Sequence, residues 1–295
     1  MPTRLQIARK DILATLDRHP TPILRLRDIE GILETHREDW RLAQTTRARE
    51  FIEYLSKSGR LKRWDFGFPY RKAIRYAWGD VPIQSVLLTL QPGCHFSHYT
   101  AEQMHELTEQ EPKTIYLNFE QPPKPKPPGG LEQDRIDAAF ARKPRLTTNV
   151  ARLGDFRVCL LNGKHTGYLG VESRDITLSN GGNIVVRVTD LERTLIDIAV
   201  RPFYAGGVAE VLKAYGKAGS QTSMNRLGAL LKELDYIYPY HQAVGFYLER
   251  SGAFKRSAIE LFREKFAFEF DFYLTYEMKQ PRYDSRWRLY VPKGY

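Results

Sequence analysis

Cysteine is scarce in this chain, which has only Cys94 and Cys159 among its 295 residues. Two cysteines so far apart support neither a dense disulfide framework nor a zinc knuckle, so reduced thiols are expected. Long apolar runs are also missing, because no uninterrupted stretch approaches the roughly 20 residues of a membrane-spanning helix. Charges recur every few positions in the first sixteen residues, which excludes the apolar core of a secretory signal. These features favour a cytoplasmic protein without a membrane anchor.

Motifs for nucleotides and metals are lacking as well. The Gly-Gly pairs do not stand in the strand-to-helix context of a phosphate-binding fingerprint. Cys94, His95, His98 and His105 are close together, but their mixed spacings match no closed zinc pattern. Helix packing and capping are the simpler explanation of these side chains. The sequence therefore predicts no cofactor and no metal.

Basic charge is abundant and unevenly distributed. The formal net charge is +10, and the content of 42% hydrophobic and 27% charged residues is typical of a globular protein. A chain of this length is expected to form two domains. The stretch from Arg41 to Arg75 contains ten basic and three acidic residues. Such a patch suits a polyanionic partner.

Residues 1–80 have the pattern of a compact helical and hairpin domain. Apolar residues at helical spacing predict a helix from Leu5 to Leu16, and "PILRL" reads as a short extended piece. Asp28 is expected to cap a second helix, and a third runs from about Trp40 to Ser58. Two strands, "RLKRW" and "KAIRYAW", complete the order of a winged helix-turn-helix.

In that fold the third helix enters the DNA groove and the hairpin is the wing, with basic side chains meeting phosphates. Thr46 and Lys57 are expected near the middle of the third helix. Glu50 and Glu53 also point outward there, and Arg49 is positioned to pair with Glu53. The candidate DNA-binding residues are Arg41, Thr45, Thr46, Arg47, Arg49, Lys57, Arg60, Lys62, Arg63, Arg71 and Lys72. The alternative is a winged helix that serves as a protein-docking module, in which the lysine and arginine side chains contact only water.

Residues 81–295 are expected to form a larger α+β domain, because strands gather early and helices late. "VPIQSVLLTL" reads as a strand or a buried helix, and residues 97–107 as a helix that starts near Ser97 or Thr100. The remaining expected strands are 113–121, 155–162, 166–173, 182–190, 268–278 and 286–292. The remaining expected helices are 207–215, 223–234, 242–248 and 257–264. Residues 122–130, with five prolines and two glycines, are expected to form an exposed loop within this domain or, alternatively, a linker.

The segment "VTDLERTLIDIAVRP", residues 188–202, predicts a mostly buried helix. Thr189 and Glu192 have the spacing of a capping box. Leu191, Leu195 and Ile198 lie on one stripe that neighbouring aliphatic residues widen. In the remaining polar strip Arg193 and Asp197 are four apart, so they can pair on the helix surface.

One pattern favours an enzyme. "YEMK" places Glu277 and Lys279 in the Glu-x-Lys order of many metal-dependent nucleases, and alternation would put both on one side of a strand. Asp271 or Glu172 would supply the further carboxylate that such a site needs. This is the alternative function, a metal-dependent nucleic-acid-cleaving enzyme with a winged-helix targeting domain.

The string "VTDLERTLIDIAVRPFYAGGVAEVLKAY", residues 188–215, resembles the hallmark segment of the AbiEi antitoxins of type IV toxin-antitoxin systems. Further likenesses are the winged helix ending in "IRYAWG", the unit "SHYTAEQMHELTEQEPKTIYL" and the terminal "SRWRLYVP". The resemblance therefore spans nearly the whole chain. It implies an amino-terminal winged helix that binds and represses the promoter of its own operon, usually at inverted repeats.

The resemblance further implies that the larger domain is a non-enzymatic antitoxin against a nucleotidyltransferase-like toxin, in abortive infection by phage. Direct contact with the toxin is not a required feature of type IV systems. The residues shared with the hallmark are Glu192, Arg193, Thr194, Asp197, Gly206 and Gly207. Among these, Glu192, Arg193 and Asp197 are the candidates for antitoxin function, with Arg193 and Asp197 as a hypothetical partner-docking pair.

Overall fold

The computed structural model describes residues 2–125, 129–178 and 180–295. Its helices and its several sheets make it a mixed α+β protein, as the sequence predicts. Internal contacts divide the chain into two compact units. The first contains Met1–Pro92 with Asn149–Leu153, and the second contains Gly93–Thr148 with Gly154–Tyr295. The sequence alone places this boundary at residue 80, ahead of a helix that the contacts assign to the first unit.

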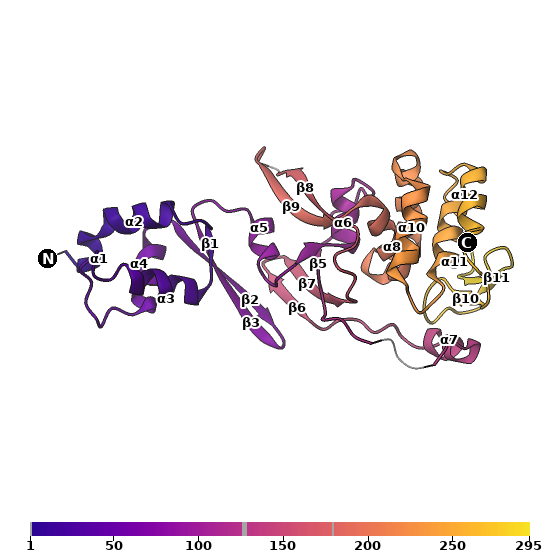
Figure 1. Ribbon diagram of the computed structural model, residues 1–295, viewed down its shortest axis with the longest axis horizontal. Helices are drawn as coiled ribbons and strands as arrows, with labels where there is room; N and C mark the ends of the chain where they lie inside the picture. The colour runs from indigo at the N-terminus through magenta and orange to yellow at the C-terminus, as the bar shows by residue number, and fades with distance from the viewer. Residues whose placement is uncertain (1, 126–128, 179) are drawn as a thin grey trace. The chain divides into compact units, whose positions relative to one another are not determined.

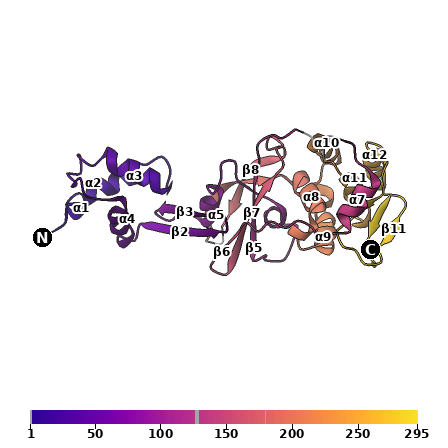
Figure 2. The ribbon, with the colours of Figure 1, turned by 90° about the horizontal axis from the view of Figure 1, so that it is seen from below.

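Four helices occupy the first part of the first unit (Figures 1 and 2). They are α1 Arg4–Ile7, α2 Arg9–Asp17, α3 Leu26–Thr35 and α4 Ala48–Lys57. The single helix expected near residues 5–16 is therefore interrupted at Ala8. Asp28 does not cap α3 as expected, because Arg25 is the N-cap and the Asp28 carboxylate accepts a hydrogen bond from its backbone N–H. The third helix starts eight positions later than expected, because a turn occupies the residues before it.

An antiparallel sheet completes this unit. It contains β1 Ile23–Leu24, β2 Leu61–Phe68 and β3 Arg71–Trp78 in the order β1-β3-β2. Leu61 stands opposite Trp78 and Phe68 opposite Arg71, so β2 and β3 form one long hairpin (Figure 1). The helices and the base of the hairpin share a core that includes Ile12, Leu24, Ile29, Leu33, Phe51 and Leu55.

The far end of the hairpin is packed against its own unit. Phe66 and Phe68 are buried near the turn. Arg75, only 6% exposed, donates to the carbonyl oxygen of Thr89 at 2.6 Å, just after α5 Ile83–Leu88. Strand β6, Val150–Leu153, is distant in sequence but belongs to the first unit, where it contacts β2. The hairpin therefore differs from a wing that projects freely into solvent.

The second unit contains a mixed sheet and helices, most of which follow the strands of this sheet in sequence. Its strands β7, β5, β4, β9 and β8 are neighbours in that order. Their bounds are β4 His95–Phe96, β5 Thr114–Glu120, β7 Phe156–Gly163, β8 Val171–Thr177 and β9 Asn183–Thr189. β5 runs parallel to β7, and β4 is parallel to β9 but antiparallel to β5. A small second sheet has the order β10-β12-β11, with β10 Phe272–Tyr273, β11 Arg282–Asp284 and β12 Leu289–Val291.

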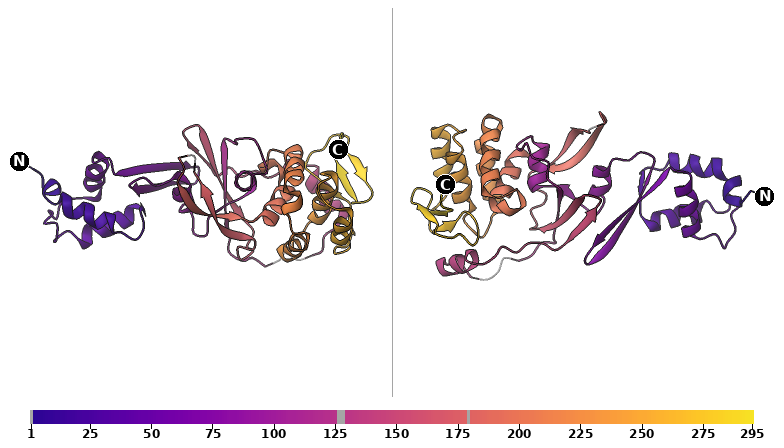
Figure 3. Two further views of the ribbon diagram at one scale, coloured as in Figure 1. Left: turned by 90° about the horizontal axis from the view of Figure 1, so that it is seen from above. Right: turned by 180° about the vertical axis from the view of Figure 1, so that it is seen from behind.

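Helix α8, Leu191–Val200, lies among the other helices of this unit (Figure 3). These are α6 His98–Met104, α7 Gln133–Phe140, α9 Val208–Ala218, α10 Met224–Leu234, α11 Tyr240–Arg250 and α12 Arg256–Arg263, with 3-10 turns at Pro202–Tyr204 and Gly219–Gln221. Gly206 and Gly207, which precede α9, both have positive φ, at 76° and 97°, a conformation that glycine adopts readily.

Two expectations for irregular segments have different outcomes. The strand expected over residues 268–278 shrinks to Phe272–Tyr273, because the chain bends after Leu274 and pairs only briefly with β12. In the proline-rich segment, residues 122–125 and 129–130 are exposed and form neither helix nor strand, as expected, and residues 126–128 lie outside the described residues. Across the described ranges, no helix has the length and apolar character to cross a lipid bilayer.

Candidate nucleic-acid interface and buried charge network

Helix α4 separates its apolar and charged residues onto opposite faces. Phe51 and Leu55 are fully buried in the core of the first unit. The exposed positions are Arg49, Glu50, Glu53, Ser56 and Lys57. At 3.6 residues per turn these five positions share one face of the helix, which is therefore available to a partner.

Arg37 fixes the turn that leads into α4. Its guanidinium donates to the carbonyl oxygens of Ala43 at 2.7 Å and Thr46 at 3.2 Å, and it pairs with Glu34. Arg37 and Thr46 are only 5% and 7% exposed. Thr46 thus precedes the helix and is buried, which corrects its expected place in the middle of the helix and removes it from the DNA-facing set. The role of Arg37 was missed because nothing local in the sequence distinguishes it from a solvated arginine.

The acidic residues of α4 differ in their partners. Glu53 pairs with Lys57 at 2.9 Å, and the Lys57 ammonium lowers the pKa of this carboxyl. The expected pairing of Arg49 with Glu53 is therefore wrong, and Lys57 stands at the end of the helix instead of near its middle. Within the described residues, neither Arg49 nor Glu50 forms an ion pair.

The basic side chains of the hairpin also fall into two groups. Arg60 is bound by Asp17, whose carboxylate also accepts from the Trp78 indole at 2.8 Å, and Arg63 pairs with Asp65 at 3.0 Å. Arg71 is exposed but reaches the carbonyl oxygen of Leu90 at 3.4 Å. Among the described residues, the candidate cations that are exposed and form no ion pair or hydrogen bond are Arg41, Arg47, Arg49, Lys62 and Lys72. Thr45 is exposed beside them.

The start of α8 is capped differently from the expectation. Asp190 is the N-cap, and its carboxylate accepts from the Arg193 backbone N–H at 2.7 Å. Thr189 instead shares a 2.8 Å hydrogen bond with the Thr194 hydroxyl. Glu192 turns away and accepts from the backbone N–H of Ser223 at 2.7 Å. The capping box is therefore wrong in detail, because Asp190 is an equally good capping residue one position later.

The candidate antitoxin residues of α8 are internal. Arg193 and Asp197 form the expected ion pair at 2.8 Å, but they are 5% and 6% exposed, so the pair is buried and does not lie on the helix surface as expected. Arg193 also donates to the carbonyl oxygen of Leu169 at 2.5 Å. Burial disfavours the charged guanidinium, but the adjacent Asp197 carboxylate outweighs it and raises the pKa of Arg193. This geometry favours a scaffold role, because every charge has an internal partner.

The histidines and a nearby glutamate are buried. His95 and His98 have pKa values lowered by burial, to about 4 for His98, and His105 hydrogen bonds to the Thr189 carbonyl oxygen at 2.7 Å. Glu102 is fully buried, and neither carboxyl oxygen has a hydrogen-bond partner in the described ranges. Burial and the nearby Glu210 raise the pKa of Glu102 to about 8. No group of three or more potential metal-binding side chains occurs among the residues that the structure describes.

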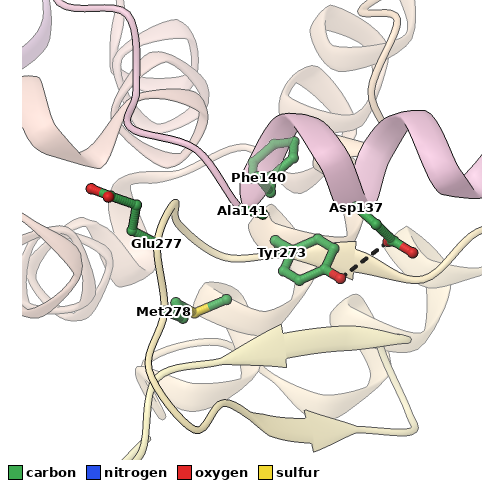
Figure 4. A pocket seen from close by; sticks show the side chains of 6 residues that line it. All are labelled: Asp137, Phe140, Ala141, Tyr273, Glu277 and Met278. Carbon is green, nitrogen blue, oxygen red and sulfur yellow. Dashed lines mark hydrogen bonds between the residues drawn. The ribbon is translucent and has the colours of Figure 1, made fainter.

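The nuclease pattern loses its expected geometry. Glu277 lies in a bend with a φ of 49°, and Lys279 is also outside any strand, so the two do not share one side of a strand. Asp271 is bound by Arg288 and Tyr283 at 2.8 and 2.7 Å. Glu277 lines a hollow with Asp137, Phe140, Ala141, Tyr273 and Met278, and its carboxylate points away from the Asp137 carboxylate (Figure 4).

Comparison with known proteins gives a likeness of structure. No family model and no curated protein match the chain. A crystal structure of the RV2827C protein from Mycobacterium tuberculosis is similar, with a TM-score of 0.58 and 15% sequence identity. The similarity covers 99% of this chain and 92% of that chain. At this level of identity the likeness concerns the fold alone.

Proposed function

We propose that the first unit is a winged helix-turn-helix that binds duplex DNA at the promoter of its own operon and represses it. The observation that carries the proposal is α4, which buries Phe51 and Leu55 and presents its charged face to solvent. Among the described residues, five exposed cations form no ion pair and no side-chain hydrogen bond, although Lys62 lies over the ring of Trp64, and these cations supply the positive charge that phosphates require. They are Arg41, Arg47, Arg49, Lys62 and Lys72.

The second unit is, in this proposal, the antitoxin against a nucleotidyltransferase-like toxin, acting in the cytoplasm without enzymatic turnover. Support comes from the sequence resemblance to AbiEi antitoxins over residues 188–215. The α8 charges serve this function indirectly, by holding α8, α10 and the segment before β8 together. An altered Arg193 or Asp197 is thus expected to reduce toxin rescue only as far as it reduces the amount of folded protein.

The test uses the full chain and its own upstream region as a fluorescent duplex. We expect specific binding that exceeds binding to a shuffled duplex at moderate ionic strength, with weaker binding by Arg47→Ala and Arg49→Ala variants. Equal and salt-insensitive binding to both duplexes would indicate a protein-docking module instead. Growth rescue on expression of the neighbouring toxin gene tests the second unit, and failure of rescue by folded protein rejects the antitoxin proposal.

A further inference from the structure

The first turn of α4 exposes two opposite charges in consecutive positions. Arg47 is the N-cap, Arg49 and Glu50 follow in the first turn, and both Arg49 and Glu50 are exposed. Consecutive residues on a helix point about 100° apart, so the two side chains address different points in space. In a helix-turn-helix, residues at this end of the recognition helix contact the edges of base pairs.

Glu50 is in a different situation from the other acid on this face. The Glu53 carboxylate is occupied by Lys57 at 2.9 Å. Four positions after Glu50 stands Tyr54, and three positions after it stands Glu53, so no cation follows at the spacing that allows a pair. Within the described residues Glu50 has neither an ion pair nor a side-chain hydrogen bond. An acid in the first turn stabilises a helix modestly, but this effect does not require exposure toward a partner.

An unpaired carboxylate on a DNA-facing surface is repelled by phosphates. The amino groups that donate in the major groove are N4 of cytosine and N6 of adenine, and a carboxylate favours cytosine because the acceptor N7 beside adenine N6 repels it. Arginine beside it has the complementary preference, because its guanidinium donates two hydrogen bonds to O6 and N7 of guanine. Arg49 and Glu50 together therefore match the chemistry of G·C base pairs.

We propose that Glu50 is a specificity-determining residue that reads cytosine and that, with Arg49, selects a G·C-containing core in each operator half-site. The inference rests on the proposed DNA-binding function. It adds a particular base preference that a merely basic helix surface would not have. Glu53, which is neutralised by Lys57, is the matched acid without this role.

The experiment selects bound duplexes from a randomised pool with the full chain and its variants. The unaltered protein is expected to enrich a cytosine at one position of the half-site. Glu50→Ala loses that preference by about tenfold, within the range of a good base contact. Glu50→Gln shifts the preference toward adenine, because an amide pairs with N6 and N7 of adenine. Glu53→Ala leaves the selected sequence unchanged.

Each contrary outcome has a distinct meaning. If Glu50→Ala binds all duplexes more tightly and selects the same sequence as the unaltered protein, Glu50 only repels phosphates and the inference is wrong while DNA binding stands. If the unaltered protein selects no sequence and does not prefer its own upstream region, the proposed function and the inference both fail. Thermal melting curves of the Glu50 and Glu53 variants are the control that these exposed positions can be replaced without unfolding the protein.

Discussion

Helices α4 and α8 are both ten residues long and carry an arginine and a glutamate in their first turns, yet they use these charges in opposite ways. The charged residues of α4 are exposed, and two of them have no partner in the described chain. Those of α8 are buried and hydrogen bonded to neighbouring elements. The same residue types therefore form an exposed charged surface in one unit and an internal support in the other.

The difference follows from the apolar residues around the charges. In α4, Phe51 and Leu55 form a narrow stripe, so the opposite face remains in water. In α8, Leu195, Ile196 and Ile198 surround the helix, so its polar side chains enter the interior with it. A charge inside a protein must be paired and hydrogen bonded, and the Arg193–Asp197 pair meets this requirement. Charge alone therefore does not identify a binding surface.

The largest effect is expected from Asp197→Ala. Removing this carboxylate leaves the Arg193 guanidinium buried without its partner, which costs about 3–5 kcal/mol of unfolding free energy. Urea unfolding of the variant and the unaltered protein measures the difference. Replacing both members, as in Arg193→Met with Asp197→Leu, removes the unpaired charge and should recover much of the loss. A single variant as stable as the parent would contradict the buried pair.

A buried ionisable group makes stability depend on pH. The folded pKa of Glu102 is about 8 against an ordinary value of 4.5. The folded state thus retains its proton while the unfolded state ionises, so stability is expected to fall by a few kcal/mol as pH rises from about 4.5 to 8. Glu102→Gln, which cannot ionise, should flatten this part of the profile. Identical unfolding midpoints against pH for parent and variant would exclude a buried, protonated Glu102.

Removing basic side chains from the surface of the first unit is expected to weaken DNA binding. Changing Arg47 and Arg49 together to alanine should weaken binding about tenfold or more and make the salt slope shallower by roughly 2, since each phosphate contact contributes about −0.9. The matched control changes Arg142 and Lys143, which are exposed in the second unit and form no ion pair among the described residues. Equal losses in the two double variants would show that only total charge matters.

The smallest effect is expected from Lys57→Ala. Its pair with Glu53 is exposed on both sides, with side chains 75% and 62% accessible. Solvent screens such an exposed pair and it contributes little to stability, so the unfolding midpoint should hardly move. A loss as large as that of Asp197→Ala would contradict the contrast between the two helices.

Local pattern predicted much of the fold. The spacing of Leu195 and Ile198 predicted a mostly buried helix, and α8 is buried along most of its length. The predictions that were wrong concern features that depend on contacts between residues distant in sequence. Arg37 has the sequence context of a surface residue, and only the folded turn before α4 buries it. Thr189 and Asp190 are both suitable capping residues, and the sequence alone does not show which of them caps α8. Strand β2, which carries the buried Phe66 and Phe68, contacts β6, a strand more than eighty positions later in the sequence.

For the candidate site, the sequence identified the residue types but not their partners. It nominated Arg60 and Arg63, which the structure shows bound to Asp17 and Asp65. It also placed the Arg193–Asp197 pair on a surface, because helical spacing gives the distance between two side chains but not their depth. Partners and depth are tertiary properties, and they decide which charges remain exposed and without an ion pair.

The salt dependence of binding to the upstream region tests the central claim most directly. If the five exposed cations of the first unit that form no ion pair in the described residues contact phosphates, log affinity against log salt concentration should fall with a slope of about −4 to −5. A slope near zero for the folded, full-length chain would contradict the assignment of these charges to DNA.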